Sequence, residues 1–258
     1  MIKFFRHIRK NLMETGKKGK YIKYAIVEII LVVIGILIAL QINTWNQARK
    51  DSITERAYYN RFLEDVLLDE ALVINQIEQT KLRLKSANQL IHELQSSDSN
   101  MPKIAQALRG SVSRGNFVLK PTQTTYEDVK SSGNVQLIKD LELKKSLENY
   151  YVSTTGIMNT INVNAARLGQ KMFAKDEMIW TGIFQLAKMQ NGFDSTKVDI
   201  NKLEQFGELN ARNKKVLLNN GVIFVSLSSR NIEHYNALKE IIIEMKKELE
   251  VKCKNDAL

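Results

Sequence analysis

The chain has 258 residues, with two prolines, one cysteine and a formal net charge of +10. So few prolines favour long helices over many short strands. The single cysteine, Cys253, excludes an intramolecular disulfide and a metal site built from cysteines.

The positive charge is concentrated before residue 25, where eight Lys and Arg and one acid, Glu14, give +7 of the total +10. A nucleic-acid-binding domain carries its basic patch on the folded part, so nucleic acid is not expected as a partner. A basic tail beside an apolar run suits lipid headgroups instead. The residues predicted to bind headgroups are Lys3, Arg6, Arg9, Lys10, Lys17, Lys18, Lys20 and Lys23.

Residues 1–20 are predicted to form a basic amphipathic tail on the cytoplasmic side. The apolar residues Met1, Phe4, Phe5, Ile8 and Leu12 fall on one helical face, and basic residues occupy the rest. This pattern is typical of a helix that lies in the membrane interface.

A transmembrane helix is predicted over residues 21–45. Residues 25–40 form a run of sixteen with a single charge, Glu28. With its flanks the run is long enough to cross a hydrocarbon core of roughly 30 Å. Tyr21, Tyr24 and Trp45 stand where interfacial aromatic anchors belong.

Two other interpretations of this run fit less well. A buried helix of a soluble protein fits poorly, because the run is apolar on nearly every face. A cleaved signal peptide fits the basic start and the apolar core. The run ends in Gln-Ile-Asn-Thr-Trp-Asn, however, which lacks the small residues of a cleavage site. An uncleaved signal anchor is therefore expected.

The orientation of the chain follows from the basic residues on each side of the span. Eight precede it, and only Arg49, Lys50 and Arg56 closely follow it. By the positive-inside rule the N-terminus is cytoplasmic. Residues 46–258 then form an extracytoplasmic domain, which in a bacterial inner membrane lies in the periplasm.

The span has a stripe of small and polar residues at alternating three- and four-residue steps. Gly35 and Ala39 would let two helices approach closely, and Glu28 is costly in lipid unless it faces a partner. The stripe predicts a homodimer or docking onto another membrane protein. The alternative is chance, with Glu28 reaching the interface. The stripe comprises Ala25, Glu28, Val32, Gly35, Ala39 and Ile42.

The outer domain is predicted to be all-α, an elongated antiparallel helical bundle into which the transmembrane helix continues. Apolar residues at helical spacing favour one helix over residues 46–95. Further helices are expected over residues 102–109, 124–130, 134–139, 140–180, 201–206 and 208–252. Thr124 or Thr125 should cap the helix over residues 124–130, and Ser131-Ser132-Gly133 should end it. Asp140 should cap the helix over residues 140–180. A loop, or at most a short extended piece around residues 117–119, is expected over residues 110–121. A break or kink is expected in the last helix at residues 219–221.

Residues 124–140 combine cap residues, an aromatic residue and acids in one short stretch. One interpretation is a tight turn between helices, with Tyr126 and Leu137 in the core. The other is a recognition corner on the membrane-distal or lateral surface. Its candidate residues are Tyr126, Glu127, Asp128, Ser131, Ser132 and Asn134.

The sequence contains no recognisable catalytic or cofactor motif. The three histidines, His7, His92 and His234, are isolated, and His92 lacks the second histidine of a zinc-protease helix. No nucleophile elbow, phosphate loop or dinucleotide fingerprint is present. No catalytic residue, metal ligand or cofactor is therefore expected.

Two stretches of the chain resemble a known family. They are residues 1–46, which include the run from Glu28 to Asn43 and the pair Trp45 and Asn46, and residues 126–138. Both are similar to a family of uncharacterised bacterial membrane proteins, domain of unknown function 6090. The resemblance implies a full-length member with an uncleaved anchor, and it supplies no activity or cofactor.

The function expected from these patterns is a membrane-anchored helical interaction or scaffold protein, which self-associates or docks onto a membrane partner. The first alternative is a ligand-sensing periplasmic bundle coupled through the transmembrane helix. The second is an enzyme, which a pocket with paired carboxylates of shifted pKa would favour.

Overall fold

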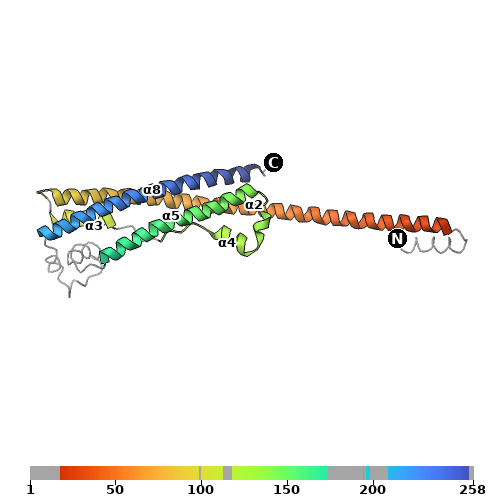
Figure 1. Cartoon of the computed structure of the whole chain (residues 1–258), viewed down its shortest axis with the longest axis horizontal. Coiled ribbons are helices and arrows are strands. Elements are labelled where there is room, and N and C mark those ends of the chain that lie inside the picture. The colour runs from red at the N-terminus through yellow and green to blue at the C-terminus, as the bar shows by residue number, and fades with distance from the viewer. Residues whose placement is uncertain are drawn as a thin grey trace. The chain divides into compact units, whose positions relative to one another are not determined.

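The structure is a computed structural model, and it describes residues 18–98, 100–112, 118–173, 194, 196–197 and 209–255. Every regular element in these residues is a helix, which confirms the predicted all-α class (Figure 1). The elements are α2 (Lys18–Gln95), α3 (Met101–Val112), α4 (Thr124–Ser131), the 3₁₀ helix η1 (Asn134–Leu137), α5 (Leu141–Phe173) and α8 (Ala211–Asn255).

The chain divides into two compact units, Met1–Ala57 and Tyr58–Leu258, and α2 contributes to both. In the first unit the described residues form only the N-terminal part of α2. Its most apolar 18-residue window has no buried residue, and it is the one helix of the described chain long and apolar enough to cross a membrane. The predicted apolar helix is therefore confirmed.

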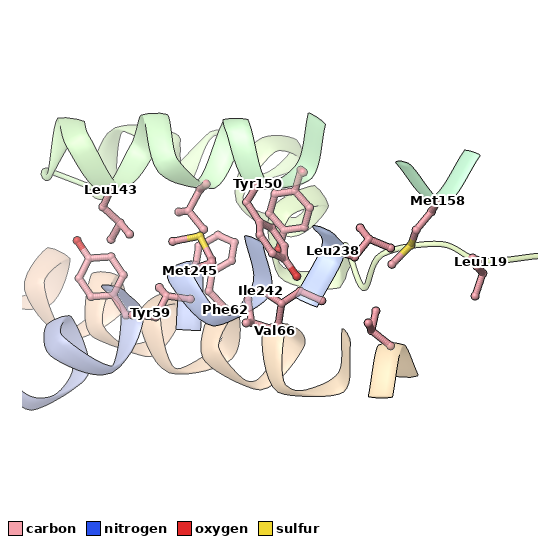
Figure 2. Close-up of a cluster of buried hydrophobic side chains, with 14 of the residues drawn as sticks. Tyr59, Phe62, Val66, Leu119, Leu143, Tyr150, Met158, Leu238, Ile242 and Met245 are labelled. Atoms are coloured by element: carbon pink, nitrogen blue, oxygen red, sulfur yellow. The ribbon is translucent and has the colours of Figure 1, made fainter. Parts of the chain in front are cut away.

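The second unit is a helical bundle built on α2, α5 and α8. Tyr59, Phe62, Val66 and Val73 of α2 recur at helical spacing and are buried, as the sequence predicts. Leu143 and Tyr150 of α5 and Leu238, Ile242 and Met245 of α8 point toward the same interior (Figure 2). Burial of this apolar stripe on each helix stabilises the bundle.

The helices do not all alternate in direction. Glu70 and Ile91 of α2 contact Lys246 and Gly221 of α8, so α8 is antiparallel to α2. By contrast, α5 runs parallel to α2. The reason is that the chain first returns toward the start of the bundle, along α3 and residues 118–140, before α5 begins (Figure 1).

A second apolar cluster joins α2, α3 and α8. It contains Ala87, Leu90, Leu94, Ile104, Ala107, Leu108, Leu217 and Phe224. Gly221 lies beside this cluster, and a Cβ placed on it would lie 2.8 Å from Cγ1 of Ile91. The missing side chain therefore allows α8 to approach α2 closely.

The predicted break at residues 219–221 is wrong, because α8 is continuous from Ala211 to Asn255, and the alternative of a kink there stays a prediction. Glycine weakens a helix by only about 1 kcal/mol, and packing on both sides of Gly221 offsets that cost. The loop predicted from residue 110 is also wrong at its start, since α3 continues to Val112. There a Cβ on Gly110 would lie 2.7 Å from the Cβ of Ser86, so this glycine too serves close packing.

Two predicted helix signals are confirmed. The carboxylate of Asp140 accepts hydrogen bonds from the amides of Glu142 and Leu143, at 3.0 and 3.1 Å, and so caps α5. Gly133, with φ of 72°, adopts the left-handed conformation that ends α4. The expected continuation of α5 to residue 180 and the short helix over residues 201–206 lie outside the described residues.

Candidate functional site

The corner predicted from the sequence packs on the first turns of α2 in the second unit. The ring of Tyr126 stacks on Tyr151 of α5, with centroids 4.3 Å apart. Asp128 pairs with Arg61 of α2 at 2.5 Å. The amide of Asn134 donates to the hydroxyl of Tyr58 at 2.8 Å. Three of the six candidate residues therefore hold the corner against the bundle.

The other three candidate residues are exposed. The hydroxyls of Ser131 and Ser132 donate to the backbone oxygen of Asp128, at 3.2 and 2.7 Å, and so close the turn after α4. Glu127 lies 3.9 Å from Lys130. These contacts support the structural interpretation of the corner, and recognition by its exposed side chains stays a prediction.

The N-terminus of α4 is capped by another helix. Asp65 of α2 accepts a hydrogen bond from the amide of Thr125 at 2.9 Å. Asp69, one turn later, accepts bonds from both the amide and the hydroxyl of Thr122, each at 2.8 Å. Carboxylates suit this position, because the first amides of a helix have no partner within it and carry partial positive charge.

The predicted cap by Thr124 or Thr125 is therefore wrong. Gln123 occupies the N-cap position and makes no side-chain cap bond, and both threonines lie within α4. The sequence does contain a signal for the true arrangement. Asp65 and Asp69 interrupt an otherwise apolar face of α2 at helical spacing, and buried acids require partners.

Asp69 is the most deeply placed member of this network, with no exposed surface. Besides the bonds from Thr122, it accepts one from the hydroxyl of Tyr150 at 2.7 Å. Burial raises the pKa of Asp69, and the hydrogen bonds from Tyr150 and Thr122 oppose that shift. Burial next to Asp69 also raises the pKa of the Tyr150 hydroxyl.

The neighbouring Tyr151 differs from Tyr150 in one respect. Its ring is 3% exposed and packs edge-on against Tyr150, with centroids 5.1 Å apart. Its buried hydroxyl has no hydrogen-bond partner among the described residues. Burial raises the pKa of Tyr151, and the nearby Asp65 and Asp69 raise it further. The hydroxyl of Tyr150 therefore donates a hydrogen bond, whereas that of the adjacent Tyr151 has no partner among the described residues.

A second buried polar group lies on α2 between the two apolar clusters. Arg83 donates to the hydroxyl of Thr80 at 2.6 Å, and it is also hydrogen-bonded to Tyr235 of α8. Burial lowers the pKa of Arg83. This contact was not predictable from the sequence, because nothing in the spacing of Arg83 separates it from the exposed basic residues of α2.

The residues predicted to act in the membrane lie on the other unit. The structure leaves Lys23, Tyr24 and Trp45 exposed. Four residues of the association stripe are also exposed, namely Val32, Gly35, Ala39 and Ile42, and the other two, Ala25 and Glu28, are partly exposed. No atom lies within 4 Å of a Cβ built on Gly35. Tyr21, Lys18 and Lys20 belong to α2, but their side chains are not described, and Lys3, Arg6, Arg9, Lys10 and Lys17 lie outside the described residues.

One family model matches the chain. It is described as a family of unknown function (DUF6090), and it covers residues 28–175, more than half of the sequence. The chain belongs to the DUF6090 family. No curated protein and no solved structure matches it.

The DUF6090 match confirms the resemblance seen in the sequence. It begins at Glu28 within the apolar segment and includes the corner with its contacts to α2 and α5. Nothing in the match assigns a chemistry. Within the described residues no group of three His, Cys, Asp or Glu is placed to hold a metal ion. Cys253 packs against the main apolar cluster at the end of α8.

Proposed function

We propose that this DUF6090 protein is a membrane-anchored helical interaction or scaffold protein, held in a bacterial inner membrane by one span over residues 21–45. The observation that carries the proposal is the exposure of the apolar part of α2. Ile29, Val33 and Leu40 are 63, 47 and 57% exposed. Exposed apolar surface of this extent is costly in water, at about 25 cal/mol per Å², and lipid removes that cost.

The proposed topology follows from charge. The basic residues before the span favour a cytoplasmic N-terminus, and the bundle of the second unit then lies in the periplasm. The lipid bilayer is the first partner of the chain. The stripe through Glu28, Gly35 and Ala39 supports a second partner, either another copy of this chain or a different membrane protein.

Crosslinking of the full-length protein in native membranes tests self-association. The Gly35→Ile variant places a bulky side chain on the stripe and should abolish a crosslinked dimer. The matched control is Leu37→Phe, which adds bulk on the opposite face of the same helix and should leave the dimer intact. If the wild-type protein forms no dimer, self-association is refuted, and the crosslinked products then identify the membrane partner.

A second candidate function is ligand sensing by the periplasmic bundle. The observation that favours it is the continuity of α2, a single helix from Lys18 to Gln95 that contains both the proposed span and core positions of the bundle. A ligand bound by the bundle would then act on the same helix that contains the proposed span. Catalysis is not proposed.

A further inference from the structure

Residues 122–134, which we call the strap, contact α2 and α5 in different ways. The strap meets α2 through four polar side chains, Tyr58, Arg61, Asp65 and Asp69, which we call the α2 polar stripe. The partners follow in reverse order along the strap: Asn134, Asp128, Thr125 and Thr122. The strap therefore lies antiparallel to α2 and in a defined register.

The chain on either side of the strap is held by α5 and α8. Just before it, the side chain of Asn162 in α5 accepts from the amide of Leu119 and donates to its carbonyl, at 2.9 and 2.8 Å. Just after it, Asp140 caps α5 and pairs with Lys252 of α8. Both flanks of the strap therefore have polar contacts with α5 or α8 that do not involve α2.

Residues of the strap itself also contact α5. Tyr126 stacks on Tyr151, and Gln123 donates to the hydroxyl of Thr155 at 3.2 Å. Apart from Val129, which is buried in the apolar cluster shared with α2, the contacts of the strap with α2 join amides and charged groups that water can also satisfy. When these hydrogen bonds are replaced by hydrogen bonds to water, the free energy changes only slightly. Separating α2, α5 and α8 would instead expose buried apolar surface, which costs more.

We propose that the interface between the strap and the α2 polar stripe is the first part of the bundle to open, while α2, α5 and α8 remain packed. Opening returns Asp65, Asp69, Thr122 and Thr125 to water and leaves the strap attached to α5. Because the strap is held by α5 and α8 and docks on α2, a shift of α2 relative to those helices breaks this interface first. The strap is thus a conformational device that responds to the position of α2.

Hydrogen–deuterium exchange of the full-length protein in detergent micelles tests the proposal. In the wild-type protein, amides of residues 122–134 should exchange faster than those of residues 143–161 and 235–249, which form the core parts of α5 and α8. Equal protection of the strap and these core segments would show that the strap opens only when the whole bundle unfolds, and would overturn the proposal.

Two variants sharpen the test. Arg61→Gln removes the pair with Asp128 and should speed exchange of the strap by about two- to fivefold, the range expected for a partly exposed ion pair. Lys145→Gln breaks a more exposed pair with Glu142, at 3.0 Å within α5 and outside the strap, and should leave strap exchange unchanged. The proposal fails if Arg61→Gln speeds the core segments by the same factor, or if strap exchange stays unchanged in this variant.

Discussion

The adjacent residues Tyr150 and Tyr151 allow a matched pair of substitutions that differ in a single hydrogen bond. Both rings are almost fully buried, at 2 and 3% exposure. The hydroxyl of Tyr150 donates to the buried carboxylate of Asp69 at 2.7 Å, whereas that of Tyr151 has no partner in the described part of the chain. Replacing either residue by Phe removes the hydroxyl and keeps the ring.

The expected free-energy changes have opposite signs. Tyr150→Phe removes a hydrogen bond to a charged group and leaves the buried Asp69 with fewer donors, which should destabilise the protein by about 1.5–3 kcal/mol. Tyr151→Phe removes a buried hydroxyl that lacks a partner, and it should be neutral or stabilising by up to about 1 kcal/mol. The two variants should therefore differ by more than tenfold in their folding equilibrium.

Urea unfolding of the full-length protein in mild detergent, followed by circular dichroism, measures both variants against the wild type. Unchanged dependence on urea concentration would show that the same structure unfolds in each case. The reasoning is refuted if Tyr151→Phe destabilises the protein as much as Tyr150→Phe does.

Other predictions concern glycines and pH. In thermal unfolding, Gly221→Ala should destabilise the protein by about 1–3 kcal/mol, because the new Cβ would lie 2.8 Å from the side chain of Ile91. Gly156→Ala is the matched control: no atom lies within 4 Å of its Cβ, so it should stabilise the protein by up to about 1 kcal/mol. Gly133→Ala should cost about 1–2 kcal/mol because of its φ of 72°, and equal stability of variant and wild type would contradict this. Burial raises the pKa of Asp69 in the folded state. The contribution of this carboxyl group to the free energy of unfolding is therefore complete below its ordinary pKa of 3.8, and it is lost as pH rises through the pKa of the folded state. The wild-type protein should therefore lose stability relative to Asp69→Asn as pH rises from about 3 to 7, and a relative gain would refute the assignment.

Much of the fold follows from periodic patterns along single helices. The apolar spacing of Tyr59, Phe62, Val66 and Val73 predicts one face of α2, and these residues are buried. Asp140 and Gly133 act locally, through the amides and backbone angles next to them, so their roles at helix ends are visible in the sequence.

Contacts between distant segments were not predictable in the same way. Gly221 is a helix breaker by local propensity, and only the approach of Ile91, far away in the sequence, explains its place within α8. Likewise, Asp65 and Asp69 cap α4 from another helix, more than fifty residues away. The candidate corner was found because its residues are neighbours in the chain, whereas its partners on α2 were missed.

Single cysteines in a Cys253→Ser background test directly whether residues 21–45 cross a lipid bilayer. The probe is a membrane-impermeant maleimide, applied to intact cells without an outer membrane. Ser52→Cys should react from outside, Asn11→Cys should react only after lysis, and Ile34→Cys should stay protected in both cases. Reaction of Ile34→Cys at the rate of Ser52→Cys, or recovery of the protein without membranes, would contradict the claim.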